Sequence, residues 1–174
     1  MASLAQIDEY YRPPSGPSPI IGQFLVTDVH FASPKPEIKS METGLRSGLK
    51  IEYSGDLGEA LNGIVARLLD FERRETGWDS YGGRSLNDKA VMPAFKLILE
   101  GIKKCQQPRL QLTGAGELDL IWESDNRYLE VTAHADGTYD ISFEDAAEGE
   151  EFESDGPASY DEALAYLARF CSVL

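Results

Sequence analysis

A short segment rich in glycine and aromatic residues, residues 77–85, separates the two strongest helical patterns of the chain. It reads Gly-Trp-Asp-Ser-Tyr-Gly-Gly-Arg-Ser. Glycine adopts backbone conformations that other residues avoid, and the polar tips of large aromatic rings need partners when the rings are buried. An aspartate in a turn accepts hydrogen bonds from nearby backbone N–H groups. The segment predicts a rigid structural corner in which Trp78 and Tyr81 are buried between helices and sheet, Asp79 accepts backbone hydrogen bonds, and Gly82 belongs to the turn.

Apolar residues at helical spacing lie on both sides of this corner. The first stripe predicts a helix over residues 57–76, and Gly77 stands where a left-handed C-terminal cap is expected. The second stripe predicts a helix over residues 87–104. Proline removes a backbone donor and clashes with the preceding turn, so this helix should begin near Met92 or be kinked at Pro93.

Four short segments with alternating apolar and polar residues follow the second helix. Turn-forming residues separate them, and the spacing predicts an antiparallel meander. Alternation places Leu118, Leu120 and Trp122 on one face of the sheet and Asp119 and Glu123 on the opposite face. The expected strands are residues 110–112, 117–123, 128–133 and 138–143.

Three further segments complete the pattern of elements. Residues 49–53 alternate cleanly and predict a short strand. Residues 146–156 are acidic with little to bury, which favours a loop. The spacing of Ser159 and Glu162 is that of a capping box and predicts the start of a last helix.

Prolines interrupt the first part of the chain repeatedly, which excludes long helices and central strands there. Residues 1–47 are therefore predicted to form an extended, proline-rich arm, with one candidate strand at residues 20–31. Residues 48–174 are predicted to form a single α+β domain. The expected fold is an antiparallel β-meander of about four strands packed against two or three helices, with the arm at the N-terminus.

The two cysteines, Cys105 and Cys171, are too few for a disulfide framework. Free cysteine is most often a small buried residue, so we expect two free thiols in a cytoplasmic protein. The N-terminus lacks the basic flank and apolar centre of a signal peptide. No apolar run approaches the roughly 20 residues that a membrane helix needs, so no membrane partner is expected.

The net charge of −14 is unevenly distributed. Residues 117–162 contain 16 Asp or Glu and one base, Arg127, which sums to −15, whereas the rest of the chain has 14 acids and 15 bases. Direct binding of nucleic acid is disfavoured, because affinity for phosphates depends on Lys and Arg. Such a segment attracts a basic protein surface, a metal ion or a basic nucleic-acid-binding groove. Acidity that only keeps the protein soluble is the plain alternative.

The predicted strands arrange this acidity in rows. Side chains two apart on a strand are separated by about 6.6–6.8 Å, and neighbouring strands by about 4.8 Å, which approximates the charge density of a nucleic-acid backbone. We expect a non-enzymatic protein without cofactor whose sheet face and acidic loop bind a basic partner. The most specific version of this hypothesis is a protein that mimics nucleic acid and inhibits a nucleic-acid-binding complex, or that neutralises such a complex as an antitoxin does. The expected partner-binding residues are Asp119, Glu123, Glu130, Asp140, Glu144, Glu150, Glu151 and Glu153.

Two alternatives stay open. One is a small metal-assisted enzyme that uses Asp79 and the meander carboxylates, with Asp79, Tyr81 and His134 as an acid–base group if the fold brings them together. The chain has no phosphate-binding loop, no serine-nucleophile elbow and no metal-ligand spacing among its histidines and cysteines. The other alternative is an accessory subunit that joins a larger assembly through its N-terminal arm.

The corner, the helix after it and the strand ending in Ile121-Trp122-Glu123 resemble an uncharacterised group of bacterial and phage proteins. Members of this group carry a Trp-Asp-x-Tyr-Gly motif ahead of a helix and a β-meander. The resemblance covers roughly residues 60–143. It implies the fold and brings no activity with it. The motif positions are Trp78, Asp79, Tyr81 and Gly82, with Trp122 as a looser match.

Overall fold

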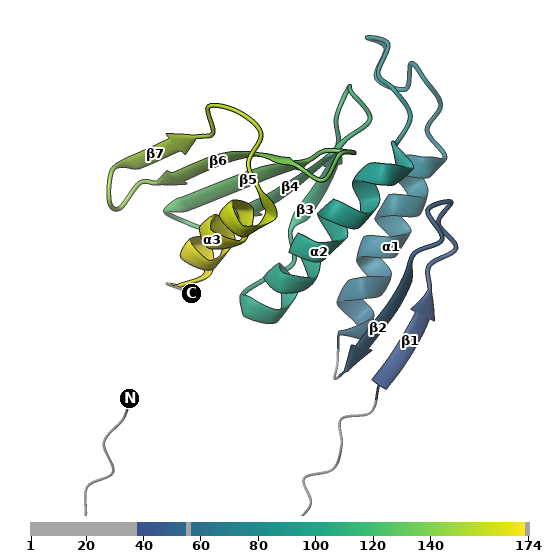
Figure 1. Ribbon diagram of the computed structural model, residues 1–174, viewed down its shortest axis with the longest axis horizontal. Coiled ribbons are helices and arrows are strands. Elements are labelled where there is room, and N and C mark those ends of the chain that lie inside the picture. Colours follow the sequence, from purple (N-terminus) through teal and green to yellow (C-terminus); the bar gives the residue numbers. More distant parts are fainter. Residues whose placement is uncertain (1–37, 55–56, 173–174) are drawn as a thin grey trace, which may run out of the picture. The chain divides into compact units, whose positions relative to one another are not determined.

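The computed structural model describes residues 38–54 and 57–172, so most of the predicted arm, including the strand expected at residues 20–31, lies outside the described residues. Within these residues the chain forms an α+β unit with three helices, a five-stranded antiparallel sheet and a two-stranded hairpin (Figure 1). The predicted fold class is confirmed, but the number of strands is larger than predicted.

The three helices lie where the sequence predicts them. The predicted second helix begins at Asp88, where the side chain of Asn87 accepts a hydrogen bond from the Lys89 N–H at 3.1 Å. A start near Met92 is therefore wrong, and Pro93 lies inside the helix. The capping box predicted at the start of the last helix is confirmed. The bounds are α1 Gly58–Glu72, α2 Asp88–Lys104 and α3 Tyr160–Cys171.

The larger sheet is a meander in which each strand is antiparallel to its neighbour in the chain. Its fifth strand, β7, lies within residues 146–156, where the composition predicts a loop. Phe152 of β7 packs on the core, and its ring stacks on Tyr166 of α3 with centroids 4.5 Å apart. Phe152 is half-buried and is the one apolar residue of this edge strand, so composition alone does not reveal the strand. The strands are β3 Arg109–Leu112, β4 Leu118–Glu123, β5 Arg127–Ala133, β6 Tyr139–Asp145 and β7 Glu150–Glu153.

The hairpin pairs β1 (Ile38–Glu42) with β2 (Lys50–Ser54). In the turn between these strands, the Thr43 hydroxyl donates to the Leu49 carbonyl at 2.7 Å, and Leu45 is buried in the core. Residues 38–47 therefore belong to the folded unit, and the boundary predicted at residue 47 is wrong. The predicted short strand at residues 49–53 is confirmed as β2.

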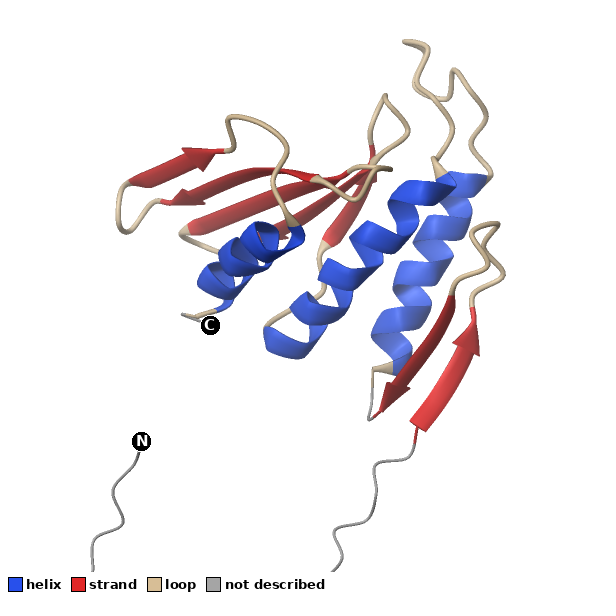
Figure 2. Ribbon diagram, viewed as in Figure 1, coloured by secondary structure: helices blue, strands red, loops and turns tan. Residues whose placement is uncertain are grey.

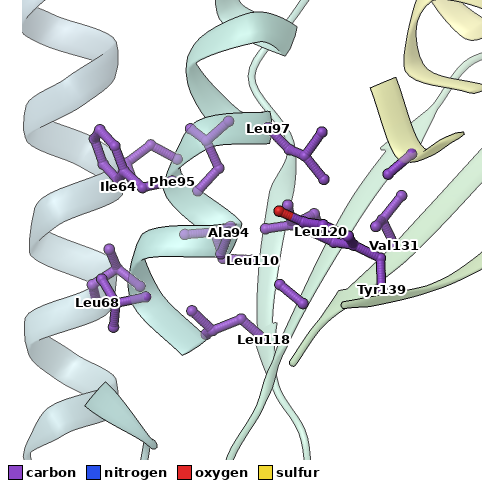
Figure 3. Close-up of a cluster of buried hydrophobic side chains, with 14 of the residues drawn as sticks. Ile64, Leu68, Ala94, Phe95, Leu97, Leu110, Leu118, Leu120, Val131 and Tyr139 are labelled. Atoms are coloured by element: carbon purple, nitrogen blue, oxygen red, sulfur yellow. The ribbon is translucent and has the colours of Figure 1, made fainter. Parts of the chain in front are cut away.

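Helices α2 and α3 cover the same face of the five-stranded sheet (Figure 2). Figure 3 shows α2 between α1 and the sheet, with Leu120 and Val131 of the sheet facing its side chains. Trp122 of β4 is fully buried, and its indole N–H donates to the Gln106 carbonyl at 3.1 Å. A Cβ atom at Gly101 of α2 would lie 2.9 Å from this ring. Only glycine therefore lets α2 approach the sheet so closely at this point.

The two cysteines form a disulfide bond between the ends of α2 and α3, with their Cα atoms 5.3 Å apart. The prediction of free thiols is wrong, because the two helices lie on one face of the sheet and end beside each other. Nothing in the spacing of two residues 66 positions apart indicates this pairing. The cytoplasmic location, which depended partly on free thiols, stays a prediction.

The corner between α1 and α2 closes around the side chain of Asp79. The Asp79 carboxylate accepts hydrogen bonds from the N–H groups of Gly83 at 2.7 Å and Tyr81 at 3.0 Å. These two bonds lower the pKa of Asp79. A Cβ atom at Gly83 would lie 2.6 Å from the same carboxylate, and Gly82 has a φ of 87°. The loop can therefore close around Asp79 only with glycine at these positions.

The aromatic residues of the corner differ from the prediction. Tyr81 is 96% exposed, so its predicted burial is wrong. Trp78 is half-buried, and its indole N–H donates to the Arg84 carbonyl at 3.0 Å. Helix α1 ends at Glu72, and its C-cap is Arg73, so Gly77 is a turn residue with a φ of 89° rather than the helix cap. The loop is held by backbone hydrogen bonds, and it needs no buried tyrosine.

The corner lies against the turn between β3 and β4. The N–H groups of Arg84 and Asn87 donate to the carbonyls of Gly114 at 2.9 Å and Gly116 at 2.8 Å. Gly116 has a φ of 85°, and a Cβ atom there would lie 2.4 Å from the Ser85 carbonyl oxygen. This contact fixes the loop before α2 on the edge of the sheet.

Gly116→Ala is expected to lower the free energy of unfolding by about 3 kcal/mol, through backbone strain and overpacking against the Ser85 carbonyl. Gly137→Ala is the matched control, because Gly137 occupies the same position in the β5–β6 turn at a φ of 88°, and a Cβ atom there would have no other atom within 4 Å. The control should show the strain alone, about 1–2 kcal/mol. Equal losses in urea unfolding would show that contact with Ser85 does not matter.

Candidate interaction surface

The face of the five-stranded sheet opposite α2 and α3, here called the outer face, carries most of the predicted binding residues. The register places seven carboxylates and one arginine on it. The acidic rows predicted from alternation therefore lie on one face, opposite the apolar rows that form the core. The outer face consists of Arg109, Gln111, Asp119, Ile121, Glu123, Tyr128, Glu130, Thr132, Asp140, Ser142, Glu144, Glu151 and Glu153.

Glu150 is the one predicted binding residue that lies on the opposite face. It is paired with Asp145 across the strands, and the guanidinium of Arg169 in α3 donates to both of its carboxylate oxygens. This ion pair ties β7 to α3. Glu150 is therefore not part of the candidate surface. The prediction included it because the sequence predicts a loop here, and alternation assigns no face to the residues of a loop.

Asp119 lies on the outer face but is only 7% exposed, so it cannot contact a partner as predicted. Its neighbours in register are Gln111 and Thr132, and the Thr132 hydroxyl donates to its carboxylate at 2.7 Å. Burial raises the pKa of Asp119, and the nearby negative charges of Glu130 and Glu117 act in the same direction. Asp119 holds the strands together and is not part of the contact surface.

Most of the carboxylates on the outer face form no ion pair with another described residue. Among the residues that the structure describes, no Lys, Arg or His nitrogen lies within 4.0 Å of the carboxylates of Glu123, Glu130, Glu144, Glu151 or Glu153. Carboxylates in neighbouring rows repel one another, as Glu144 and Glu151 do directly across β6 and β7. The outer face thus holds unpaired negative charge that a basic partner would compensate.

Two members of the face are tied to neighbours. The Tyr128 hydroxyl donates to the Glu130 carboxylate, and burial together with this bond raises the pKa of Tyr128 to about 12. Asp140 contacts the ring of His134 at 3.0 Å. The remaining acidic residues project from a sheet whose positions are fixed by backbone pairing.

The outer face is hollowed beside Asp140. A hollow of about 260 Å³ is bounded by carboxylates and hydroxyls, and a second hollow of about 370 Å³ adjoins it at His134. Carboxylates accept hydrogen bonds and do not donate them, so such a lining favours the ammonium or guanidinium group of a bound side chain. The first hollow is lined by Glu130, Thr132, Asp140, Ser142, Glu153 and Ser154, with Ile141 beneath.

The residues proposed for an acid–base group are not brought together. Asp79 is held by backbone N–H groups in the corner, Tyr81 points into solvent, and His134 contacts Glu117 and Asp140. Within residues 38–54 and 57–172, no group of three or more His, Cys, Asp or Glu residues is arranged to hold a metal ion. Asp79, Tyr81 and His134 therefore do not form the acid–base group of the enzyme alternative.

No helix in the described part of the chain is long and apolar enough to cross a membrane. The resemblance carried by Trp78, Asp79, Tyr81 and Gly82 stays an expectation. Comparisons with models of protein families, with curated proteins and with solved structures find no match to this chain.

Proposed function

We propose that this protein is a non-catalytic interaction protein that binds a basic partner protein through its outer face. The observation that carries the proposal is the set of five carboxylates, Glu123, Glu130, Glu144, Glu151 and Glu153, that form no ion pair within the described chain. Gathering like charges on one rigid face costs electrostatic free energy, and a positively charged surface relieves that cost on binding. Solubility alone does not require this concentration, because charges spread over the whole surface serve it equally well.

The arrangement of the charges supports a partner that ordinarily binds nucleic acid. The carboxylates stand on a sheet lattice of about 4.8 Å by 6.6–6.8 Å, similar to the spacing of phosphates along nucleic acid. A groove built to bind phosphates with Lys and Arg would find comparable charges here. The protein would then act as an inhibitor that competes with nucleic acid for the groove, or as an antitoxin-like neutraliser.

The test begins with affinity purification of the tagged protein from its host, followed by measurement of the dissociation constant for the protein that co-purifies. The outer-face variant Glu123→Lys/Glu144→Lys/Glu151→Lys should weaken binding at least about 100-fold, because each carboxylate meets a positive group of the partner. Asp119 is left unchanged, since reversing a buried charge would damage the fold rather than the surface.

The matched control carries the same change in net charge away from the outer face. Glu42, Glu52 and Glu75 are exposed and lie in β1, in β2 and after α1. Replacing these three residues with lysine should leave binding within a few-fold of wild type. If the control variant loses the partner and the outer-face variant keeps it, the outer face is not the binding surface. The wild-type affinity should also fall steeply with added salt, and displacement of the partner's nucleic acid would identify the inhibitor form.

A further inference from the structure

Three residues from separate segments meet at one end of the outer face. His134 follows β5, Glu117 precedes β4, and Asp140 belongs to β6. The Nδ1 atom of His134 lies 2.9 Å from a Glu117 oxygen, and its Nε2 atom lies 3.0 Å from an Asp140 oxygen. The side chain of His134 is 19% exposed, so the ring is largely enclosed between its two partners.

Both ring nitrogens lie within hydrogen-bonding distance of a carboxylate oxygen, and both can donate only if each carries a hydrogen. Carboxylate oxygens only accept hydrogen bonds, and neutral imidazole has a single N–H, whereas the imidazolium ion has two. A neutral ring would point one nitrogen lone pair at a carboxylate, so one of the two contacts would be lost. Contact with both carboxylates therefore belongs to the protonated form of His134.

The charged groups around the ring are acidic. Glu117 and Asp140 contact it directly, Asp119 faces it from β4, and Asp136 lies in the turn between β5 and β6. Partial burial lowers the pKa of His134. The hydrogen bonds and charges of Glu117 and Asp140 outweigh this and raise the pKa above its usual value of 6.5.

We propose that His134 is a pH-controlled clamp whose protonated ring joins the start of β4 to β6. Deprotonation of the ring releases one of its two carboxylate partners, Glu117 or Asp140, to the outer face. Loss of the ring's charge also makes the outer face more negative by one unit. This goes beyond the binding function, because the clamp operates in the isolated protein. It places a titratable switch at the edge of the hollow that Asp140 lines.

The sign of the effect on stability follows from the raised pKa in the folded state. A histidine of this kind contributes its full stabilisation below its unfolded pKa, about 6.5. The contribution is lost as the pH rises through the higher folded value. The stability advantage of wild type over His134→Gln should therefore shrink as the pH rises from 6 towards 9.

Proton NMR tests the clamp directly, because the chain has only two histidines. His30→Gln leaves one set of histidine ring signals, which are those of His134. We expect their titration midpoint above 6.5, and Glu117→Gln or Asp140→Asn should each lower it by about one unit. Glu144→Gln, which removes one carboxylate elsewhere on the outer face, should leave the midpoint nearly unchanged.

Two results would overturn the clamp. One is a midpoint at or below 6.5 in the protein with His134 intact. The other is a midpoint that shifts equally in the Glu144 control and in the variants of Glu117 and Asp140, which would reflect the general charge of the face. The stability measurement is independent of these signals, and parallel pH curves for wild type and His134→Gln would contradict the proposal as well.

Discussion

Replacing Trp122 with alanine is expected to lower the free energy of unfolding by about 3–5 kcal/mol, the range for a large buried aromatic side chain. The ring is fully buried in β4 and lies against Gly101 of α2 with no space to spare. Its removal leaves a cavity between helix and sheet, and it also leaves the Gln106 carbonyl without its indole donor. Urea unfolding followed by far-ultraviolet circular dichroism measures the loss.

Trp78→Ala is the control variant for Trp122→Ala, and the two losses of unfolding free energy are compared. Trp78 is only half-buried, and it lies beside the guanidinium of Arg74, 4.8 Å from the ring centroid. Its removal should cost clearly less than the removal of Trp122, because less apolar surface is taken from a closed environment. A larger loss for Trp78 than for Trp122 would mean that the corner, and not the sheet, organises the core.

Removing the disulfide bond is expected to lower the free energy of unfolding by about 4 kcal/mol. The bond closes a loop between residues 66 positions apart, and the chain-entropy model assigns about this value to such a loop. The expected loss is large because Cys105 and Cys171 are the ends of α2 and α3, which cover the same face of the sheet. Unfolding of the variants without reducing agent, compared with wild type, provides the measurement.

The single and double cysteine variants separate a bond from two independent thiols. Either Cys105→Ala or Cys171→Ala alone breaks the bond, so each should cost nearly as much as both changes together. Wild type in reducing agent should approach the double variant. If the two single losses add up to the loss of the double variant, the cysteines act separately and the bond does not exist in solution.

The regular elements of the fold could be predicted because their residues repeat with the period of the element. The apolar stripes locate α1 and α2, the capping box locates the start of α3, and the alternation of residues 117–143 locates the strands and the faces of the acidic rows. β7 was missed because its single apolar residue, Phe152, stands between glutamates. A pattern of two or three residues carries too little signal to distinguish an edge strand from a loop.

The errors in the candidate site come from contacts between distant segments. Alternation assigns Asp119 to the outer face correctly, yet only the register shows that Gln111 and Thr132 flank it and bury it. The direction of Tyr81 depends on how the loop closes around Asp79, which composition does not specify. The contact of His134 with Glu117 and Asp140 likewise depends on the register of three segments, and no pattern in the sequence predicts it.

The order of strands in the larger sheet has a consequence for how the chain folds. Each strand pairs only with its neighbours in the chain, so the sheet assembles by closing short turns. Short loops cost little conformational entropy to close, and proteins dominated by contacts between near neighbours in sequence fold faster than others. The sheet can therefore form before α2 and α3 cover it. The two cysteines lie before β3 and after β7, so we expect their bond to form after the sheet, which brings the ends of both helices together.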